Sequence, residues 1–141
     1  MGEVSVALAN WNGAAHIGRC LEAVFGQSHP VGEVVVVDNG STDGSREWVG
    51  QHYPQITLLQ NPRNQGFAAG YNRAIAACTR AHVLVLNADV FLALDFVEQA
   101  LPGFAHPPAV AAVTGRIFQE GTGEDINGGF FLRRQLRMLP S

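Results

Sequence analysis

Three short polar clusters carry the side chains in this sequence that are best suited to binding chemistry. They are Asn10-Trp11-Asn12, Asp38-Asn39-Gly40 and Asn87-Ala88-Asp89. Each cluster directly follows an apolar run, so we expect each to lie at the carboxyl end of a buried strand. Ligands of open α/β sheets bind just beyond those strand ends. The clusters therefore predict one cleft, formed by residues that are far apart in the chain.

Three side chains of these clusters have a specific chemistry to offer. Asp38 can accept a hydrogen bond from the imide N–H of uracil or thymine, but an aspartate here can equally well close the turn. Asp89 is a hard oxygen ligand suited to Mg²⁺ or Mn²⁺ on a diphosphate, and it could also be a turn residue. Trp11 can stack on a base or fill the core. The sequence leaves these alternatives open.

A fourth polar segment, NPRNQGFAAGYN at residues 61–72, leads into a predicted helix. Its Gly66 and Gly70 allow the backbone to approach a ligand closely. The helix N-terminus would direct free N–H groups and the positive end of its dipole toward a phosphate. Positive charge near the predicted ligand loops comes from His16, Arg19, Arg63 and Arg73.

The elements that must position these residues alternate between strand and helix. Buried apolar runs predict strands at Val4–Ala9, Val34–Asp38, Ile56–Leu59, His82–Leu86 and Ala109–Thr114. Helical spacing and caps predict helices at His16–Gly26, from Ser41 or Thr42 to about His52, at Phe67–Thr79, and from about Leu94 to Leu101, where Pro102-Gly103 would stop the last one. This alternation predicts a Rossmann-like α/β fold, with a mainly parallel sheet and helices on both faces.

Composition and charge exclude several classes of protein. With 141 residues and 47% hydrophobic content, the chain fits one globular domain, and its net charge of −3 argues against a nucleic-acid partner. No apolar run approaches the roughly 20 residues of a transmembrane helix, and we expect no signal peptide before the first strand. Cys20 and Cys78 lack metal-ligand spacing and are expected to be reduced thiols. We therefore expect a cytoplasmic protein, with the inner face of the membrane as an alternative location.

The motifs of several other enzyme classes are missing. The sequence contains neither the G-x-G-x-x-G dinucleotide fingerprint nor the G-x-x-x-x-G-K-[ST] phosphate loop. It has no G-x-S-x-G serine elbow, and its five histidines show no i, i+4 pair that would suggest zinc.

Four motifs appear together in an order and spacing that belong to a known family. They are VSVALANWNG, VVVVDNGSTDGS, NPRNQGFAAGYNRAI and VLVLNADVFLALDFVEQAL. Over roughly Val4 to Phe118 the chain resembles family 2 inverting glycosyltransferases, and most of all their rhamnosyltransferase-like branch. The resemblance implies a GT-A fold that stops early, a nucleotide-diphosphate sugar donor, Mg²⁺ or Mn²⁺, and a glycan or lipid-linked acceptor.

The resemblance also implies roles for individual residues. The nucleotide-binding residues would be Asn10, Trp11, Asn12, Asp38, Gly66, Asn72 and Asn87. Asp89 would hold the metal in an N-x-D form of the family's D-x-D motif, and Asn87 would form a hydrogen bond with the ribose. Asp38 would be the aspartate that reads the pyrimidine. Asn10 and Trp11 depart from the usual Thr and Tyr of the segment that lines the base.

The resemblance covers only the donor half of such an enzyme. Family members carry a second half with the acceptor site and the general base, which we expect beyond Ser141. Glu124-Asp125 comes too early and lies in a glycine-rich loop. We therefore expect a nucleotide-sugar-binding half-domain over 1–118, followed over 119–141 by a loop and an apolar, basic stretch that promotes self-association.

Two functional hypotheses follow. In the first, the chain is the donor-binding part of an enzyme that transfers a sugar with inversion from a UDP- or dTDP-linked donor, dTDP-rhamnose being one candidate, to a glycan or lipid-linked acceptor. In the second, it is a non-catalytic nucleotide-sugar-binding fragment that lacks the base. A nucleotidyltransferase is a weaker third hypothesis, because a basic, glycine-rich loop would then follow the first strand, and Asn10–Gly13 is not such a loop.

Overall fold

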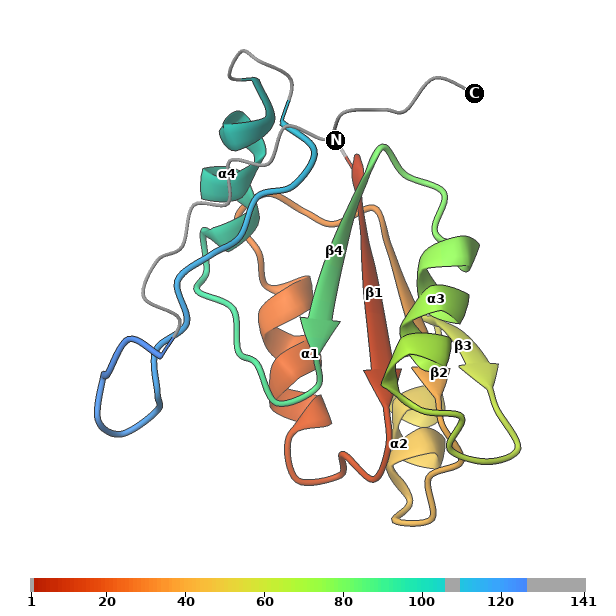
Figure 1. The fold of residues 1–141 in the computed structure, drawn as a ribbon. Helices are drawn as coiled ribbons and strands as arrows, with labels where there is room; N and C mark the ends of the chain where they lie inside the picture. The colour runs from red at the N-terminus through yellow and green to blue at the C-terminus, as the bar shows by residue number, and fades with distance from the viewer. Residues whose placement is uncertain (1, 106–109, 127–141) are drawn as a thin grey trace. The chain divides into compact units, whose positions relative to one another are not determined.

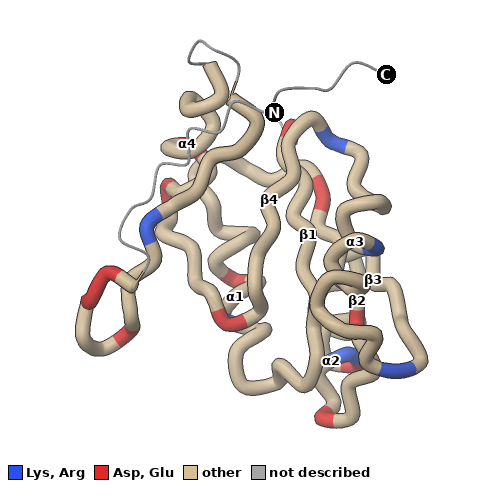
Figure 2. Tube along the Cα trace, in the orientation of Figure 1, with Lys and Arg blue, Asp and Glu red and all other residues tan. Residues whose placement is uncertain are grey.

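Four parallel strands form a single sheet in the computed structural model, which describes residues 2–105 and 110–126 (Figure 1). The strands are β1 (Val4–Asn10), β2 (Glu33–Asp38), β3 (Thr57–Gln60) and β4 (His82–Asn87), in the spatial order β3-β2-β1-β4. β1 and β2 are almost entirely buried because helices cover both faces of the sheet. Of the residue types Lys, Arg, Asp and Glu, the four strands contain only Glu33 and Asp38, at the two ends of β2 (Figure 2).

Helices pack on both faces of this sheet, as the sequence predicted. On one face, α1 (Ile17–Phe25) and α2 (Ser45–His52) bury an apolar stripe. On the opposite face lies α3 (Phe67–Ala77), whose Ala74 packs against alternate residues of β1 and β2. The small side chains of α3 let its backbone come close to the strands. The fold is therefore the predicted Rossmann-like α/β arrangement.

The register of the strands brings the predicted polar clusters together. Asn10 at the end of β1 lies beside Asp38 at the end of β2, and Ala9 lies beside Asn87 at the end of β4. From β1 the chain passes through α1 to β2 on one side, whereas β4 lies on the other side of β1. Such a reversal of strand order is where open α/β sheets bind ligands.

The chain divides into two compact units, Met1–Asp95 and Phe96–Ser141. The predicted boundary after residue 118 falls inside the second unit and stays a prediction. That unit contains α4 (Phe96–Ala100) and a 3₁₀ turn, η1 (Leu101–Ala105). The expectation that Pro102-Gly103 stops the helix is only partly correct, because both residues lie within the turn that continues it. Proline is tolerated in the first turn of a helix, where its missing N–H has no partner to lose.

The predicted fifth strand at Ala109–Thr114 is wrong for residues 110–114, which form no strand, while Ala109 lies outside the described residues. Its core is alanine-rich, and alanine is a poor strand former. In the described part of this unit, the strand-like pairing is one isolated bridge between Phe118 and Asp125. The predicted association stretch, Phe130–Ser141, also lies outside the described residues.

Two further expectations concern cysteines and membranes. Cys20 and Cys78 are free thiols, as the sequence predicted. Among the helices within 2–105 and 110–126, none is long and apolar enough to cross a bilayer.

Candidate functional site

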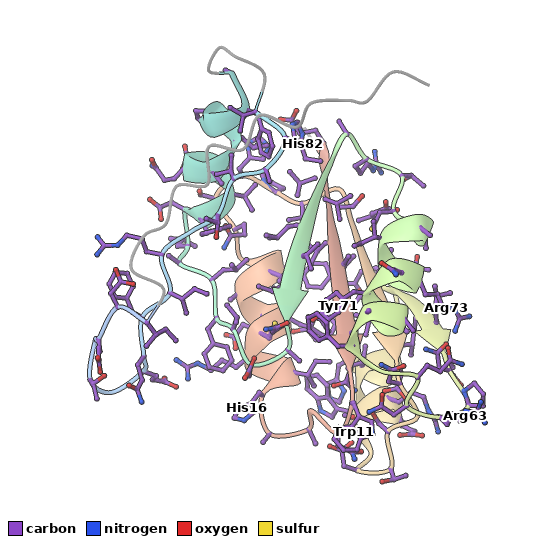
Figure 3. All side chains as sticks on the ribbon, viewed as in Figure 1. Trp11, His16, Arg63, Tyr71, Arg73 and His82 are labelled. Atoms are coloured by element: carbon purple, nitrogen blue, oxygen red, sulfur yellow. The ribbon has the colours of Figure 1, made fainter. Side chains whose placement is uncertain are left out.

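An open cleft of about 400 Å³ lies at the carboxyl ends of β1 and β4. It is lined by Ala9, Asn10, Trp11, Asn12, Gly13, His16, Asn39, Asn64, Phe67, Tyr71, Asn87, Ala88 and Asp89. Figure 3 shows Trp11, His16 and Tyr71 at this end of the sheet. The structure therefore brings together five predicted site residues, namely Asn10, Trp11, Asn12, Asn87 and Asp89. Asp38, Gly66 and Asn72 do not line the cleft.

Two aromatic rings of the cleft are exposed. Trp11 is 57% exposed and Phe67, at the start of α3, is 69% exposed. The alternative that Trp11 fills the core is therefore wrong, and its stacking on a base stays a prediction. Phe67 was not predicted, although its position in the glycine-rich segment directly after Gly66 was a usable signal. Its ring packs 4.5 Å from that of Tyr71, centroid to centroid.

Asp38 is fully buried and holds the turn after β2. Its Oδ2 accepts hydrogen bonds from the backbone N–H groups of Gly40 (3.1 Å) and Ser41 (2.9 Å). Its Oδ1 accepts one from Nδ2 of Asn10 (3.0 Å). Since 0% of Asp38 is exposed, this geometry supports the turn role that the sequence left open. A direct contact between Asp38 and a base stays a prediction.

Side-chain hydrogen bonds join the loop after β1 to the loop after β2. Nδ2 of Asn10 donates to the hydroxyls of Ser41 (3.3 Å) and Ser45 (2.9 Å). Asn12 donates its backbone N–H to Ser41 Oγ (2.9 Å) and accepts from the N–H of Thr42 (2.8 Å) at its Oδ1. These bonds fix the loop that carries Trp11, so the backbone that positions the indole ring is held in place.

Gly13 is required by the tight packing of the same loop. A Cβ atom at this position would lie 2.3 Å from Oδ1 of Asn10. Asn10 is 1% exposed, and its Oδ1 has no hydrogen-bond partner among the described residues. Any side chain at position 13 would therefore displace Asn10 and, with it, the loop that lines the cleft.

Asn39, rather than Asp38, is the residue of its cluster that lines the cleft. Its Oδ1 accepts from Nδ2 of Asn61 (2.8 Å), and its Nδ2 donates to the carbonyl of Gly66 (3.2 Å). Arg73 donates in turn to Oδ1 of Asn61. The charged Arg73 thus orients Asn61, and Asn61 orients Asn39. Sequence analysis placed Asn39 in the right cluster but gave it no role.

Gly66 and Asn72 lie beside the cleft rather than in it. The N–H of Gly66 donates to Oδ1 of Asn64 (2.8 Å), and its φ of 91° falls in the region that favours glycine. Gly66 therefore shapes the chain that leads into α3. Asn72 is exposed on α3. A contact between either residue and a nucleotide stays a prediction.

Asn87 and Asp89 form the end of the cleft that follows β4. Both are exposed, and Oδ1 of Asn87 lies 2.9 Å from the hydroxyl of Tyr71, which donates to it. Burial raises the pKa of the nearby Cys20 thiol to about 12, and the negative charge of Asp89 adds to this rise. Cys20 is therefore a neutral thiol buried in the core.

The residues present fit a divalent cation only together with a ligand. No group of three His, Cys, Asp or Glu side chains that could hold a metal occurs among the described residues. Asp89 is the one carboxylate among the residues that line the cleft. Mg²⁺ is commonly bound by one or two carboxylates together with substrate phosphates and water. The chemistry of this donor set is thus compatible with a metal carried by a diphosphate.

One known protein family matches this chain over most of its length. The family described as Glycosyl transferase family 2 matches residues 5–139. The chain therefore belongs to glycosyltransferase family 2. The first unit has an α/β fold of the GT-A type, as its structural neighbours do.

Three similar proteins illustrate the family. Chondroitin synthase of Escherichia coli is 30% identical over 78% of this chain and 16% of its own length. A structure of S. aureus TarS in complex with UDP matches with a TM-score of 0.64 and 25% identity, over 72% of this chain and 31% of that one. The mannosyltransferase PcManGT from Pyrobaculum calidifontis, in complex with GDP-Man and Mn²⁺, matches with a TM-score of 0.65 and 32% identity, over 74% and 33%. The chain thus spans a third or less of these proteins.

Proposed function

We propose that this chain forms the donor-binding part of an inverting glycosyltransferase, with a UDP- or dTDP-linked sugar as donor. Membership of family 2 supports the reaction class, and the complex of TarS with UDP supports a uridine nucleotide. The match to a GDP-mannose complex makes a guanosine nucleotide the competitor that must be tested. A rhamnosyltransferase-like specificity for dTDP-rhamnose is the finer form of the proposal and rests on the sequence motifs.

One observation carries this proposal. The exposed rings of Trp11 and Phe67 and the exposed carboxylate of Asp89 line the same cleft, although they come from three separate segments. Aromatic rings stack on bases, and a carboxylate holds the cation of a diphosphate. A nucleoside diphosphate offers both groups in one molecule.

The metal would be held by Asp89 together with the diphosphate. A bound Mg²⁺ or Mn²⁺ would supply charge stabilisation for the diphosphate leaving group. The chain's own contribution is to hold the nucleotide in a fixed orientation, with the base against the aromatic rings and the diphosphate at the end of β4. Asn10 and Asn12 fix the loop on which Trp11 lies.

The second hypothesis, a non-catalytic binding fragment, is favoured by a different observation. Inverting transfer needs a general base that deprotonates the acceptor hydroxyl. Asp89 is the one carboxylate among the described residues of the cleft, and the proposal assigns it to the metal. Asp125 of the second unit forms a salt bridge with Arg116, with 2.7 Å between Oδ2 and Nη2. No general base is therefore assigned in the described part of the chain.

The proposal for the acceptor rests on the family alone. We propose a glycan or lipid-linked acceptor, which is consistent with the similarity to a chondroitin synthase. Such an acceptor would place the protein in the cytoplasm or at the inner face of the membrane.

The test is calorimetric titration of the chain with UDP, dTDP and GDP, each with and without Mn²⁺. We expect Mn²⁺-dependent binding of a pyrimidine diphosphate, and its loss in Asp89→Asn. Asp95→Asn is the matched control, because Asp95 is exposed and does not line the cleft. Absence of binding by the folded wild-type chain would refute the proposed function. Equal loss in both variants would remove Asp89 from the metal role.

A further inference from the structure

His16 lies at the start of α1, at the end of the cleft that follows β4 (Figure 3). The backbone N–H of Cys20 donates to the carbonyl of His16 (3.0 Å), which closes the first turn of the helix. Sγ of Cys20 lies 3.6 Å from the backbone carbonyl oxygen of Asn87, at the end of β4. Residues four apart lie on the same side of a helix, so His16 continues the side of α1 that faces this strand end. Its ring lies 6.4 Å, centroid to centroid, from that of Phe91, two residues after Asp89.

The imidazole of His16 is available to a ligand. The residue is exposed, and its side chain does not cap α1. Neither ring nitrogen has a hydrogen-bond partner within the part of the chain that the structure describes. An imidazole presents at least one N–H donor in either charge state, and it is the side chain that gains a positive charge most readily near neutral pH.

The composition of the cleft makes this imidazole distinctive. Among the described residues that line the cleft, His16 is the only one whose side chain can carry a positive charge, and Asp89 is the one carboxylate. Arg19 is close in the chain, but its guanidinium lies 4.0 Å from the centroid of the Phe91 ring, and Arg19 does not line the cleft. The oxygens of a diphosphate are charged acceptors, and hydrogen bonds to charged acceptors are roughly twice as strong as neutral ones. A diphosphate at this end of the cleft would therefore find its cationic donor in His16.

We propose that His16 is a binding residue for the diphosphate of the donor, with an imidazole N–H that donates to a phosphate oxygen. The inference rests on the proposed function, because that function places a diphosphate at the end of β4. Asp89 then contacts the cation, whereas His16 contacts a phosphate directly from the start of α1. His16 should contribute to the binding of UDP whichever divalent cation is present, and it should contribute nothing to the binding of uridine.

The test is calorimetric titration of His16→Ala and His16→Lys with UDP, in Mn²⁺ and in Mg²⁺. We expect His16→Ala to weaken UDP binding about ten-fold with either cation, the loss of one hydrogen bond to a charged acceptor. His16→Lys should stay within about three-fold of wild type, because an ammonium group also donates to phosphate. Uridine, measured by competition with UDP, should bind to His16→Ala within about two-fold of wild type, since it has no phosphate contact to lose.

Two controls separate the lost contact from a change in folding. His52→Ala removes another exposed imidazole, which belongs to α2 and does not line the cleft, and it should leave UDP affinity unchanged. His16→Ala should keep the melting temperature of wild type, because the side chain is exposed and caps no helix.

The outcomes distinguish this inference from the proposed function. Equal UDP affinity of His16→Ala and wild type would overturn the inference while donor binding stands. A loss in Mn²⁺ but not in Mg²⁺ would also overturn it and would make His16 a metal ligand, since imidazole suits transition metals better than Mg²⁺. An equal loss for uridine would show that His16 acts on the nucleoside and not on the phosphates. Failure of the wild-type chain to bind any nucleotide would instead overturn the proposed function and the inference with it.

Discussion

At the scale of the residue, Asp38 and Asn39 are chain neighbours with separate roles. Asp38 accepts three hydrogen bonds from the protein and is buried, so Asp38→Asn should destabilise the fold by about 1–3 kcal/mol. Urea denaturation measures this loss. Nucleotide affinity of the folded fraction should stay within about two-fold of wild type, because Asp38 is buried and does not line the cleft.

The opposite result would contradict a purely structural role of Asp38. An Asp38→Asn variant with normal stability and a selective loss of UDP and dTDP binding would show that Asp38 reads the base. Asn39→Ala is the matched comparison, since Asn39 lines the cleft one residue further along.

Trp11 provides a second prediction for a single side chain. Its indole is 57% exposed, so Trp11→Ala should leave the melting temperature unchanged while it weakens nucleotide binding. Stacking of one base on an aromatic ring is worth about 1–3 kcal/mol, which is roughly 5- to 150-fold in affinity. Trp11→Phe should retain most of the affinity, and calorimetric titration with UDP distinguishes the two variants. Equal affinity in wild type and Trp11→Ala would place the base elsewhere.

The position of the site could be predicted from the sequence more accurately than the roles of its individual residues. Asn10, Trp11, Asn87 and Asp89 were found because each follows an apolar strand, and parallel strand ends meet at one edge. Which residue of a cluster faces the cleft depends on how the turn closes, and that depends on contacts between loops. The contact between Tyr71 and Asn87 could not be predicted, because it arises from the packing of α3 against β4.

At the scale of the element, the close approach of α3 to the sheet yields a prediction with an internal control. A Cβ atom on Gly70 would lie 2.7 Å from Nδ2 of Asn39, whereas one on Gly50 of α2 would meet nothing closer than 3.8 Å. Gly70→Ala should therefore cost about 1–3 kcal/mol of stability. Gly50→Ala should gain up to about 1 kcal/mol, because alanine is the better helix former.

Urea denaturation of the two variants tests this pair, and Gly70→Ala should also weaken UDP binding by displacing Asn39. A stability gain in both variants would contradict the close packing of α3.

Glu33 links three segments at the amino end of the sheet, opposite the cleft. Its Oε1 accepts hydrogen bonds from the hydroxyls of Ser5 (2.5 Å) and Thr79 (3.0 Å) and from the N–H of Thr79. The bond from Ser5 is the largest cause that holds the pKa of Glu33 below its usual value, against an opposing effect of burial. The contribution to stability is therefore present above the unfolded-state pKa of about 4.3 and is lost as the pH falls through the folded-state pKa.

The corresponding variants are Glu33→Gln and Ser5→Ala. Glu33→Gln should lower the melting temperature at pH 7, and the difference from wild type should disappear in acid, where the native carboxyl is protonated as well. Ser5→Ala should reduce the pH dependence of the melting temperature. A Glu33→Gln difference that persists unchanged in acid would refute this linkage.

The elements of the first unit were predictable because their patterns are strong. Four β-branched residues at Val34–Val37 indicate a doubly buried strand, and the amphipathic spacing of α1 indicates a helix that covers one face. The failed strand at 110–114 had a weaker pattern, rich in alanine. Apolarity alone does not make a strand, because a strand also needs a neighbour with which its backbone can pair.

At the scale of the whole molecule, every residue that lines the cleft lies between Ala9 and Asp89, within the first unit. Nucleotide binding should therefore not depend on residues 127–141. A chain that ends at Ile126 should bind UDP with wild-type affinity in the calorimeter. A large loss would show that the second unit contributes to the donor site.

Two surfaces of the molecule are candidates for self-association. The sequence attributes it to the apolar, basic stretch Phe130–Ser141, but β4 offers a competing surface. Val83 and Val85 are 39% and 50% exposed, and β4 carries none of the charges that protect natural sheet edges. In light scattering, a chain that ends at Ile126 should be a monodisperse monomer, whereas Val85→Lys in the full chain should still associate. The reverse pattern would assign association to β4, and a monomeric full chain would refute both surfaces.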